Sequence, residues 1–398
     1  MENKMKLIKI YNCRAITASR ILSDATVIVK DGVIEELTTG KIEVNDAKEI
    51  DGNGLYVSPG FIDLHTHGAG NHDFMDGSVE AYLEAARVHA CHGTTLLYPT
   101  TLTSTNGALF NSFEKYEKAC SCNHNGAAFG GIHLEGPYFA HSQRGAQDPR
   151  FLKTPVPSDY QEILSCTNHI VRWSIAPELP GALELGNYLD NRGILPSIAH
   201  TDATYEEVLK AFDCGYRHIT HFYSAMSGIT RKNAFRYAGV IESGYLINGM
   251  TLEIIADGIH VPKSLMQLVY KIKGAENIAL VTDSMRAAGM PDGKSILGSI
   301  EEGQEVLIED GVAKLPDRSA FAGSVATADR LVRTATKIAE IPLCEAVRMV
   351  SATPAGIMGI QQHKGSLQKG KDADLVLFNE NIDIKMTMVK GNIVYENL

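Results

Sequence analysis

The sequence has no long apolar run and no basic tract. No stretch of its 398 residues approaches the roughly 18 consecutive apolar residues of a membrane-spanning helix, and Met1–Arg14 contains no apolar signal segment. The net charge of −10 disfavours nucleic acid and anionic membranes as partners, because each requires a positively charged face. We therefore expect a cytoplasmic protein whose partner is a small molecule.

The cysteines are few, and their spacing shows no regular pairing. The seven are scattered, and the one close pair, Cys120-Ser-Cys122, lacks a second pair that could complete a zinc knot. Free thiols are the expected state in a reducing compartment. An apolar content of 44% with 21% charged residues excludes disordered and fibrous proteins and is typical of a globular enzyme.

The two ends of the chain share a pattern of short strands and tight turns. Lys30-Asp31-Gly32 and Lys390-Gly391-Asn392 both have the composition of a hairpin turn between apolar runs. Because both ends have this pattern around a long middle segment, we predict one small β-sandwich-like domain formed by residues 1–55 plus 360–398. Residues 56–359 then form the catalytic domain.

The middle segment alternates short apolar runs with stretches of helical periodicity, such as 79–91, 203–214 and 262–272. The runs cover residues 56–64, 94–99, 129–134, 170–176, 194–199, 218–222, 251–256 and 277–282. Eight strand–helix repeats predict the α/β class, with a closed (β/α)8 TIM-type barrel in preference to an open sheet. Residues 286–321, with glycine, proline and short strands, are expected to cross one end of this barrel.

Six of the eight predicted strands end in residues that can bind a metal or transfer a proton. These are His65 with His67, Glu135, His200, His221, Asp257 with His260, and Asp283. The carboxyl ends of barrel strands converge on one mouth, where active sites lie. The spacing of His65 and His67 directs both imidazoles to the same face of their strand.

This set of side chains predicts a divalent metal site. Imidazole and carboxylate groups suit Zn²⁺, Fe²⁺ or Mn²⁺. There are more candidate ligands than one tetrahedral ion needs. We therefore expect one or two ions, and two if one carboxylate bridges them. The candidates are His65, His67, Glu135, His200, His221 and Asp283.

Several motifs carry a family resemblance. Pro59-Gly-Phe-Ile-Asp63-Leu-His65-Thr-His67-Gly68 resembles the first-strand signature of the amidohydrolase superfamily. Four further motifs are similar, in chain order, to those of the N-acetylglucosamine-6-phosphate deacetylases: His133-Leu-Glu135-Gly136-Pro137, Ala199-His200-Thr-Asp202, Ala256-Asp257-Gly258-Ile-His260 and Thr282-Asp283. The resemblance continues through Gly370-Lys-Asp-Ala-Asp374 and so covers nearly the whole chain.

The resemblance implies hydrolysis of N-acetyl-D-glucosamine 6-phosphate to D-glucosamine 6-phosphate and acetate. Glu135, His200 and His221 would form the main metal centre, and His65 and His67 would add a second. The divalent ion would activate water for attack on the acetamido carbonyl. Asp283 would act as general base and then as general acid toward the departing amine.

The substrate side departs from the family pattern at three places. Gln147 replaces a His over the reacting centre, and Ser224, followed by Ala225, replaces an Asn near the phosphate. The family's Arg-x-Pro-Gly, whose Arg reaches a phosphate across a dimer interface, is rewritten here, so that Arg231 or Arg236 is the candidate. His260 matches the family's phosphate-side His. The resemblance thus implies a homodimer, with substrate contacts from Gln147, Ser224, Ala225, Arg231, Arg236 and His260.

These departures leave an alternative substrate open. It is another N-acetylated sugar, with or without a phosphate, or an N-acyl amino acid. A non-catalytic scaffold would be expected to lose a metal ligand or Asp283, and the sequence retains all of them.

Overall fold

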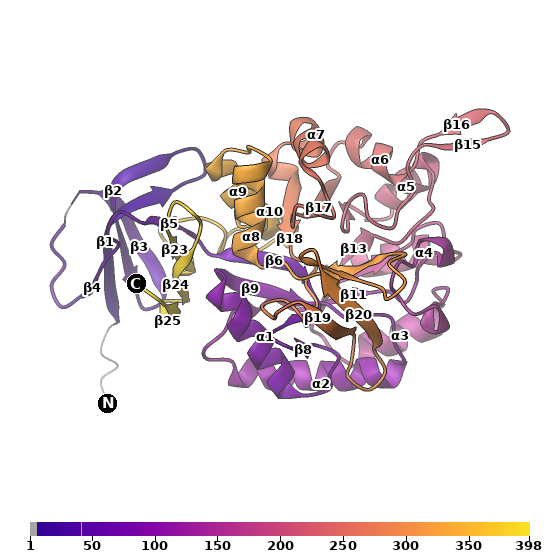
Figure 1. Cartoon of the computed structure of the whole chain (residues 1–398), viewed down its shortest axis with the longest axis horizontal. Helices are drawn as coiled ribbons and strands as arrows, with labels where there is room; N and C mark the ends of the chain where they lie inside the picture. The colour runs from indigo at the N-terminus through magenta and orange to yellow at the C-terminus, as the bar shows by residue number, and fades with distance from the viewer. Residues whose placement is uncertain (1–5, 41) are drawn as a thin grey trace.

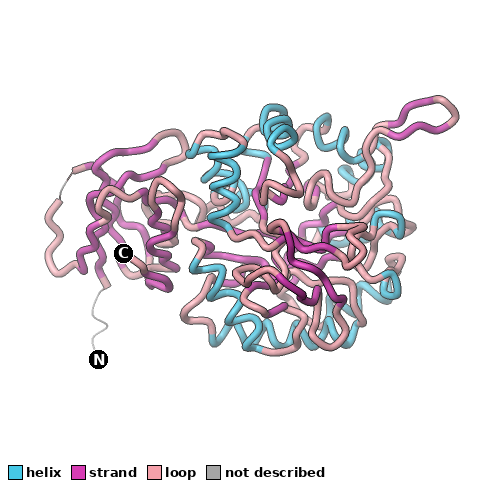
Figure 2. Tube along the Cα trace, in the orientation of Figure 1, coloured by secondary structure: helices cyan, strands magenta, loops and turns pink. Residues whose placement is uncertain are grey.

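The computed structural model describes residues 6–40 and 42–398 and has two parts (Figure 1). A β-rich part contains strands from both ends of the chain, and the larger part is a strand barrel surrounded by helices (Figure 2). In the described residues, no helix combines the length and the apolar character needed to cross a membrane.

The β-rich part is one eight-stranded sheet in the order β25-β24-β23-β5-β1-β2-β3, with β4 paired to β1. Its strands are β1 (Leu7–Ile16), β2 (Ile21–Lys30), β3 (Val33–Thr39), β4 (Lys48–Asp51), β5 (Tyr56–Pro59), β23 (Leu375–Phe378), β24 (Ile384–Val389) and β25 (Asn392–Glu396). Antiparallel pairing of β5 with β23 joins the N-terminal and C-terminal strands. Their alternate residues form a common apolar core that includes Ile10, Val27, Leu375 and Met386.

The two hairpin turns of this sheet pack against each other. Asp31 and Gly32 both have positive φ, as do Lys390 and Gly391, which suits tight turns that continue the twist of the strands. A Cβ on Gly391 would lie 2.8 Å from the Cα of Gly32. Glycine at these positions therefore allows the close approach of the two chain ends.

The larger part is the (β/α)8 barrel predicted from the sequence, which is confirmed. Its parallel strands are β6 (Phe61–Thr66), β9 (Thr94–Pro99), β11 (Ile132–Glu135), β12 (Ile170–Ile175), β13 (Leu195–Ile198), β14 (His218–Ile219), β17 (Thr251–Ile255) and β18 (Ile278–Val281). Single bridges between Thr100 and His133 and between Thr66 and Ser284 close the circle. A short strand, β10 (Ala128–Phe129), pairs with β9.

The first apolar run, expected as one strand over 56–64, is two strands. β5 belongs to the sheet of the termini, and β6 opens the barrel. Gly60 lies between them, and a Cβ there would come within 2.1 Å of Oγ1 of Thr95. The chain can therefore pass from one sheet to the other only with glycine at this point.

Helices surround the barrel at the expected places. They are α1 (Val79–Cys91), α2 (Asn106–Cys122), α3 (Pro157–Ser165), α4 (Ala182–Asp190), α5 (Tyr205–Asp213), α6 (Val240–Leu246), α7 (Lys263–Lys273), α8 (Ala328–Arg333), α9 (Leu343–Met349) and α10 (Ala352–Ile357). Short helical turns occupy His141–Gln143, Pro149–Phe151, Ala275–Asn277 and Thr334–Ile338. Ser78 begins α1 by accepting the N–H of Ala81, and Thr204 and Glu207 form a capping box on α5.

Two excursions extend beyond the strand ends. The first is a four-stranded antiparallel sheet of β19 (Gly293–Leu297), β20 (Gln304–Glu309), β21 (Val312–Lys314) and β22 (Phe321–Ser324). It begins within the predicted crossing segment of residues 286–321, extends to Ser324, and rejoins the barrel where Ser324 N donates to Asp283 O at 2.8 Å. The second is a hairpin of β15 (Thr230–Lys232) and β16 (Phe235–Tyr237) that projects away from the body (Figure 1). A small pair, β7 (Gly68–Ala69) and β8 (His72–Asp73), follows β6.

Candidate metal centre and active site

Four buried histidines meet at the carboxyl ends of the barrel strands. The Nε2 atoms of His65 and His67 lie 3.3 Å apart, and those of His200 and His221 lie 3.1 Å apart. Two nitrogens bound to one tetrahedral ion at about 2.0–2.1 Å would be about 3.3 Å apart. Both pairs therefore have the spacing of ligands that share a cation.

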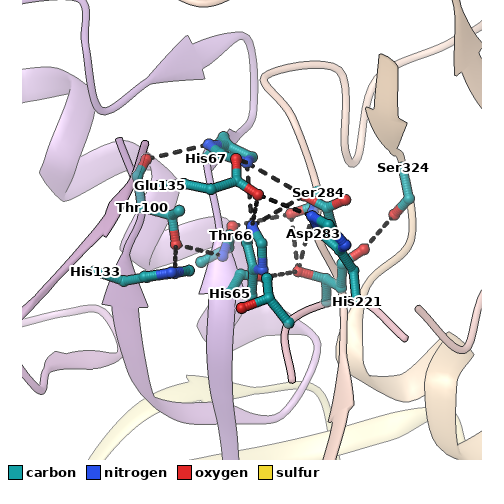
Figure 3. A network of polar contacts seen from close by, with 12 residues as sticks. His65, Thr66, His67, Thr100, His133, Glu135, His221, Asp283, Ser284 and Ser324 are labelled. Atoms are coloured by element: carbon teal, nitrogen blue, oxygen red, sulfur yellow. Dashed lines mark hydrogen bonds and ion pairs between the residues drawn. The ribbon is translucent and has the colours of Figure 1, made fainter. Parts of the chain in front are cut away.

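Glu135 is grouped with both pairs, and Figure 3 shows it with His65, His67 and His221. Its Oε1 is 3.0 Å from Nε2 of His221 and 3.4 Å from Nε2 of both His65 and His200. Its Oε2 is 3.5 Å from Nε2 of His67. Two candidate ion groups result, His65–His67–Glu135 and Glu135–His200–His221, and they share one carboxylate. This donor set fits one divalent ion or a bridged pair.

Two of the histidines and the nearby Asp283 adopt a strained backbone conformation. His200, His221 and Asp283 have φ of 45°, 29° and 45°, and each lies two residues beyond the last residue of its strand. A left-handed turn at that position directs the side chain into the mouth of the barrel. Such conformations cost of order 1 kcal/mol each and cluster at active sites.

Asp283 faces the first ion group. Its Oδ1 lies 3.3 Å from Nε2 of His65 and 3.2 Å from Nε2 of His67. Burial alone would raise its pKa, but the two histidines hold the pKa of Asp283 below its usual value. Burial likewise opposes ionisation of Glu135, whose pKa is held well below the usual value by His65, His200 and His221. Both shifts favour the ionised form of the carboxylate, which metal binding and proton acceptance require.

Two charged residues buried beneath the site, Glu253 and Arg172, were not predicted from the sequence. Nδ1 of His65 lies 2.7 Å from Oε1 of Glu253, and Arg172 donates to Oε2 of Glu253 at 2.7 Å. All three side chains are fully buried. Glu253 and Arg172 each interrupt an apolar strand run, at 251–256 and 170–176, and this is the sequence signal that could have identified them.

His133 is not part of either ion group. Its Nε2 pairs with Ser174 Oγ at 2.7 Å and its Nδ1 with Thr100 Oγ1 at 3.1 Å. Its ring stands edge-on to that of His65, with the centroids 4.8 Å apart. His133 therefore supports the ligand histidine from behind.

A cavity of about 440 Å³ opens above the two ion groups. Of the predicted substrate contacts, the structure places Gln147, Ser224, Ala225 and His260 in its lining, whereas Arg231 and Arg236 do not line it. The lining also includes Phe321, whose ring centroid lies 4.6 Å from that of His260. His260 is held from behind by Asp257, whose Oδ2 lies 2.8 Å from Nδ1 of the ring.

Gln147 is held in one orientation. Its Oε1 accepts hydrogen bonds from N and Oγ1 of Thr103 at 2.9 and 2.7 Å. Its Nε2 donates to Oε2 of Glu135 at 2.7 Å. An amide nitrogen carries two hydrogens, so one N–H of Gln147 is left for the cavity.

Arg231 and Arg236 lie opposite each other in the register of the projecting β15–β16 hairpin. Every residue of the two strands is exposed, and Phe235 at 72% and Ile229 at 68% are among the most exposed large apolar residues. The hairpin thus presents basic and apolar side chains away from the cavity of its own chain.

Comparison with known proteins decides the family. The model of the amidohydrolase family matches residues 56–394. The chain belongs to the amidohydrolase family. It is 32% identical over 391 residues to the N-acetylglucosamine-6-phosphate deacetylase of Lysinibacillus sphaericus, covering 96% of this chain and 97% of that one. It is 29% identical over 381 residues to the N-acetylgalactosamine-6-phosphate deacetylase of Escherichia coli O157:H7, covering 96% and 97%.

Solved structures of this amidohydrolase group agree in fold. A variant of the N-acetyl-D-glucosamine-6-phosphate deacetylase of Mycobacterium smegmatis, solved with N-acetyl-D-glucosamine 6-phosphate, superimposes with a TM-score of 0.89 at 27% identity and covers 98% of this chain and 99% of that chain. The resemblance inferred from the motifs is confirmed.

Proposed function

We propose that this amidohydrolase removes the acetyl group of N-acetyl-D-glucosamine 6-phosphate, giving D-glucosamine 6-phosphate and acetate. The observation that carries the proposal is the arrangement of Glu135, His67, His200, His221 and Asp283 at the floor of one cavity, with His65 grouped with His67 and Glu135. The names of the relatives support the substrate. The enzyme takes one or two divalent ions, Zn²⁺, Fe²⁺ or Mn²⁺ by donor chemistry.

A divalent ion at these ligands supplies a Lewis acid and lowers the pKa of water. Asp283, beside the first ion group, accepts the proton of the attacking water. It then returns that proton to the nitrogen of the sugar, because an amine must leave protonated. The ionised state of Asp283 suits the first of these steps.

Gln147 is positioned to contact the acetamido carbonyl. One of its N–H groups is used by Glu135, and the other is left for the cavity. A fixed donor next to the carbonyl stabilises the negative charge that develops on its oxygen. We assign this role to Gln147, in the place where the family usually has a histidine.

The phosphate is proposed to lie among Ser224, Ala225 and His260, with an arginine from a second copy of the chain. Within one chain the β15–β16 hairpin projects from the body (Figure 1), and its arginines do not line the cavity. Phe235 in the hairpin and Ile229 just before it are exposed and suit an interface. A homodimer that brings Arg231 or Arg236 of the partner subunit to the phosphate accounts for both features.

The test is release of acetate from N-acetylglucosamine with and without the 6-phosphate. We expect kcat/KM to be at least about 100-fold higher for the phosphorylated sugar, because hydrogen bonds to a charged group contribute up to about 3 kcal/mol. N-acetylgalactosamine 6-phosphate serves as a second comparison, since one relative bears that name. Equal rates with and without phosphate would favour the alternative of another N-acylated substrate.

A cytoplasmic location is also proposed. Each of the seven cysteines is a free thiol in the described part of the chain. Cys120, Cys122 and Cys166 are exposed, a state that a reducing compartment maintains.

A further inference from the structure

Glu253, on β17, lies beneath both ion groups and contacts each of them. Its Oε1 is 2.7 Å from Nδ1 of His65, which belongs to the first group. The same oxygen accepts the backbone N–H of His221, which belongs to the second group, at 3.2 Å. One carboxylate oxygen therefore fixes a side chain of one group and the backbone of the other.

The second carboxylate oxygen of Glu253 is bound by side chains inside the barrel. Nη1 of Arg172 donates to Oε2 at 2.7 Å, and Nε2 of His218 lies 3.3 Å from the same oxygen. Arg172 is in turn held by Leu64 O, Thr220 Oγ1 and Ser197 Oγ, at 3.2, 2.8 and 3.0 Å. An arginine only donates, so it keeps this oxygen as an acceptor and prevents rotation of the carboxylate.

This arrangement sets the tautomer of His65. An ionised carboxylate only accepts hydrogen bonds, so the hydrogen of the neutral imidazole must be on Nδ1. The lone pair is then on Nε2, the atom that faces Nε2 of His67 at 3.3 Å and Oε1 of Glu135 at 3.4 Å. Only this tautomer lets His65 serve as a ligand.

We propose that Glu253, held by Arg172, is a positioning residue for metal binding that sets the tautomer of His65 and its spacing to His221. It is fully buried and lies outside the lining of the cavity. Outer carboxylates that orient a ligand histidine commonly raise metal affinity 10- to 100-fold. The inference rests on the proposed metal-dependent function.

The substitution Glu253→Gln tests the inference with minimal change of shape. A glutamine must turn its oxygen toward Arg172, because Arg172 only donates, and this leaves its NH₂ facing His65 and the N–H of His221. Nδ1 of His65 would then accept, and its hydrogen would move to Nε2, which could no longer bind an ion. We expect the variant to bind the ion of the His65 group at least about 10-fold more weakly.

Two measurements besides activity report the weaker ion binding. Metal titration followed by elemental analysis counts the ions per subunit, and the visible spectrum of the Co²⁺-loaded protein reports the ligand set. Ser197→Ala is the matched control, since it removes one hydrogen bond of Arg172 but leaves Glu253 in place. The control should keep wild-type ion binding. A folded Glu253→Gln variant with wild-type affinity and spectrum would overturn the inference.

A measurement on the unaltered chain covers the case in which Glu253→Gln does not fold. ¹⁵N NMR of histidine-labelled metal-free protein, with the His65 signal assigned by its loss in His65→Asn, should show the hydrogen on Nδ1. A hydrogen on Nε2 would overturn the inference. Wild-type protein that binds no divalent ion would instead overturn the proposed function, while the NMR spectrum would still test the tautomer.

Discussion

Oδ1 of Asp283 lies 3.2 Å from Nε2 of His67. The first residue follows β18 and the second follows β6, strands that become neighbours only when the barrel closes. The contact places a carboxylate beside one ion group and on the floor of the cavity. It is the geometric basis for assigning proton transfer to Asp283.

Asp283→Asn should keep its metal and lose turnover. The amide cannot accept a proton from water or return one to the amine, so kcat should fall at least about 100-fold. Acetate release and metal content, measured on the same preparation, test this. Asp292→Asn, at an exposed loop position, is the matched control and should behave as wild type. Acetate release near the wild-type rate from Asp283→Asn would refute the assigned role.

Removal of divalent ions by a chelator should abolish activity and lower thermal stability. The ligands come from β6, β11 and the segments after β13 and β14, so an ion bound among them stabilises the folded barrel. At a free ion concentration 100 times Kd, the gain is about 2.7 kcal/mol. Activity assays and melting curves during re-addition of Zn²⁺, Fe²⁺ or Mn²⁺ measure both effects. Full activity in metal-free protein would contradict the prediction.

Gln147→Ala should lower kcat about 10- to 100-fold, since it removes both the donor to Glu135 and the N–H left for the carbonyl. Gln304→Ala provides the control. That side chain donates to the backbone of Ala146, next to the site, but does not line the main cavity. If the two variants have the same kcat, Gln147 has no special role.

If one subunit supplies an arginine to the site of the other, two inactive variants should complement each other in a mixed dimer. Arg231→Ala and Arg236→Ala are each mixed with Asp283→Asn after unfolding and reassembly. If the arginine acts across the interface, a mixed dimer contains one complete site, and activity should recover to about a quarter of wild type. Only the arginine that contacts phosphate should show this effect. Lys232→Ala, in the same hairpin, is the control. Recovery in neither mixture would argue for an arginine acting within its own chain, or for none.

His89 should make stability depend on pH. Burial, with a smaller contribution from His92, lowers its pKa from 6.5 to about 4, so the folded protein keeps this imidazole neutral. The unfolded chain binds more protons between these values, and stability therefore falls as pH drops from 6.5 toward 4, by at most about 3 kcal/mol.

The comparison that isolates this effect is His89→Gln, which can keep a hydrogen bond to Thr66 Oγ1. Its free energy of unfolding should decline less than that of wild type between pH 7 and pH 5. Urea denaturation at both pH values measures the difference. Parallel declines in the two proteins would show that His89 does not contribute.

Elements with strong local signals were predicted closely. β9 and α1 have the predicted bounds, since Thr94–Pro99 is a continuous apolar run and Val79–Cys91 is an amphipathic segment that begins at a Ser cap. The division at Gly60 was not predicted. Both neighbouring strands are buried and apolar, so hydropathy does not change where the chain passes from one sheet to the other.

Contacts between strands that are distant in the chain could not be predicted from local sequence patterns. Glu253 and Arg172 each stand out as a charge in an apolar run, yet nothing along the chain shows that the two meet. Their pairing at 2.7 Å depends on how the barrel closes around its interior. His89, in the last turn of α1, is buried against Thr66 of β6, and this contact too depends on the tertiary structure.

The sequence by itself determined the barrel, the family and the residue types at the metal centre, because strand periodicity and the placement of residues at strand ends are local properties. Tertiary structure alone decided how these residues combine. It placed Glu135 between two pairs of histidines, turned Gln147 toward Glu135, and left Arg231 and Arg236 away from the cavity of their own chain. Distances of 3 Å between residues far apart in the chain follow from closure of the barrel and from the left-handed turns after its strands, which no local pattern encodes.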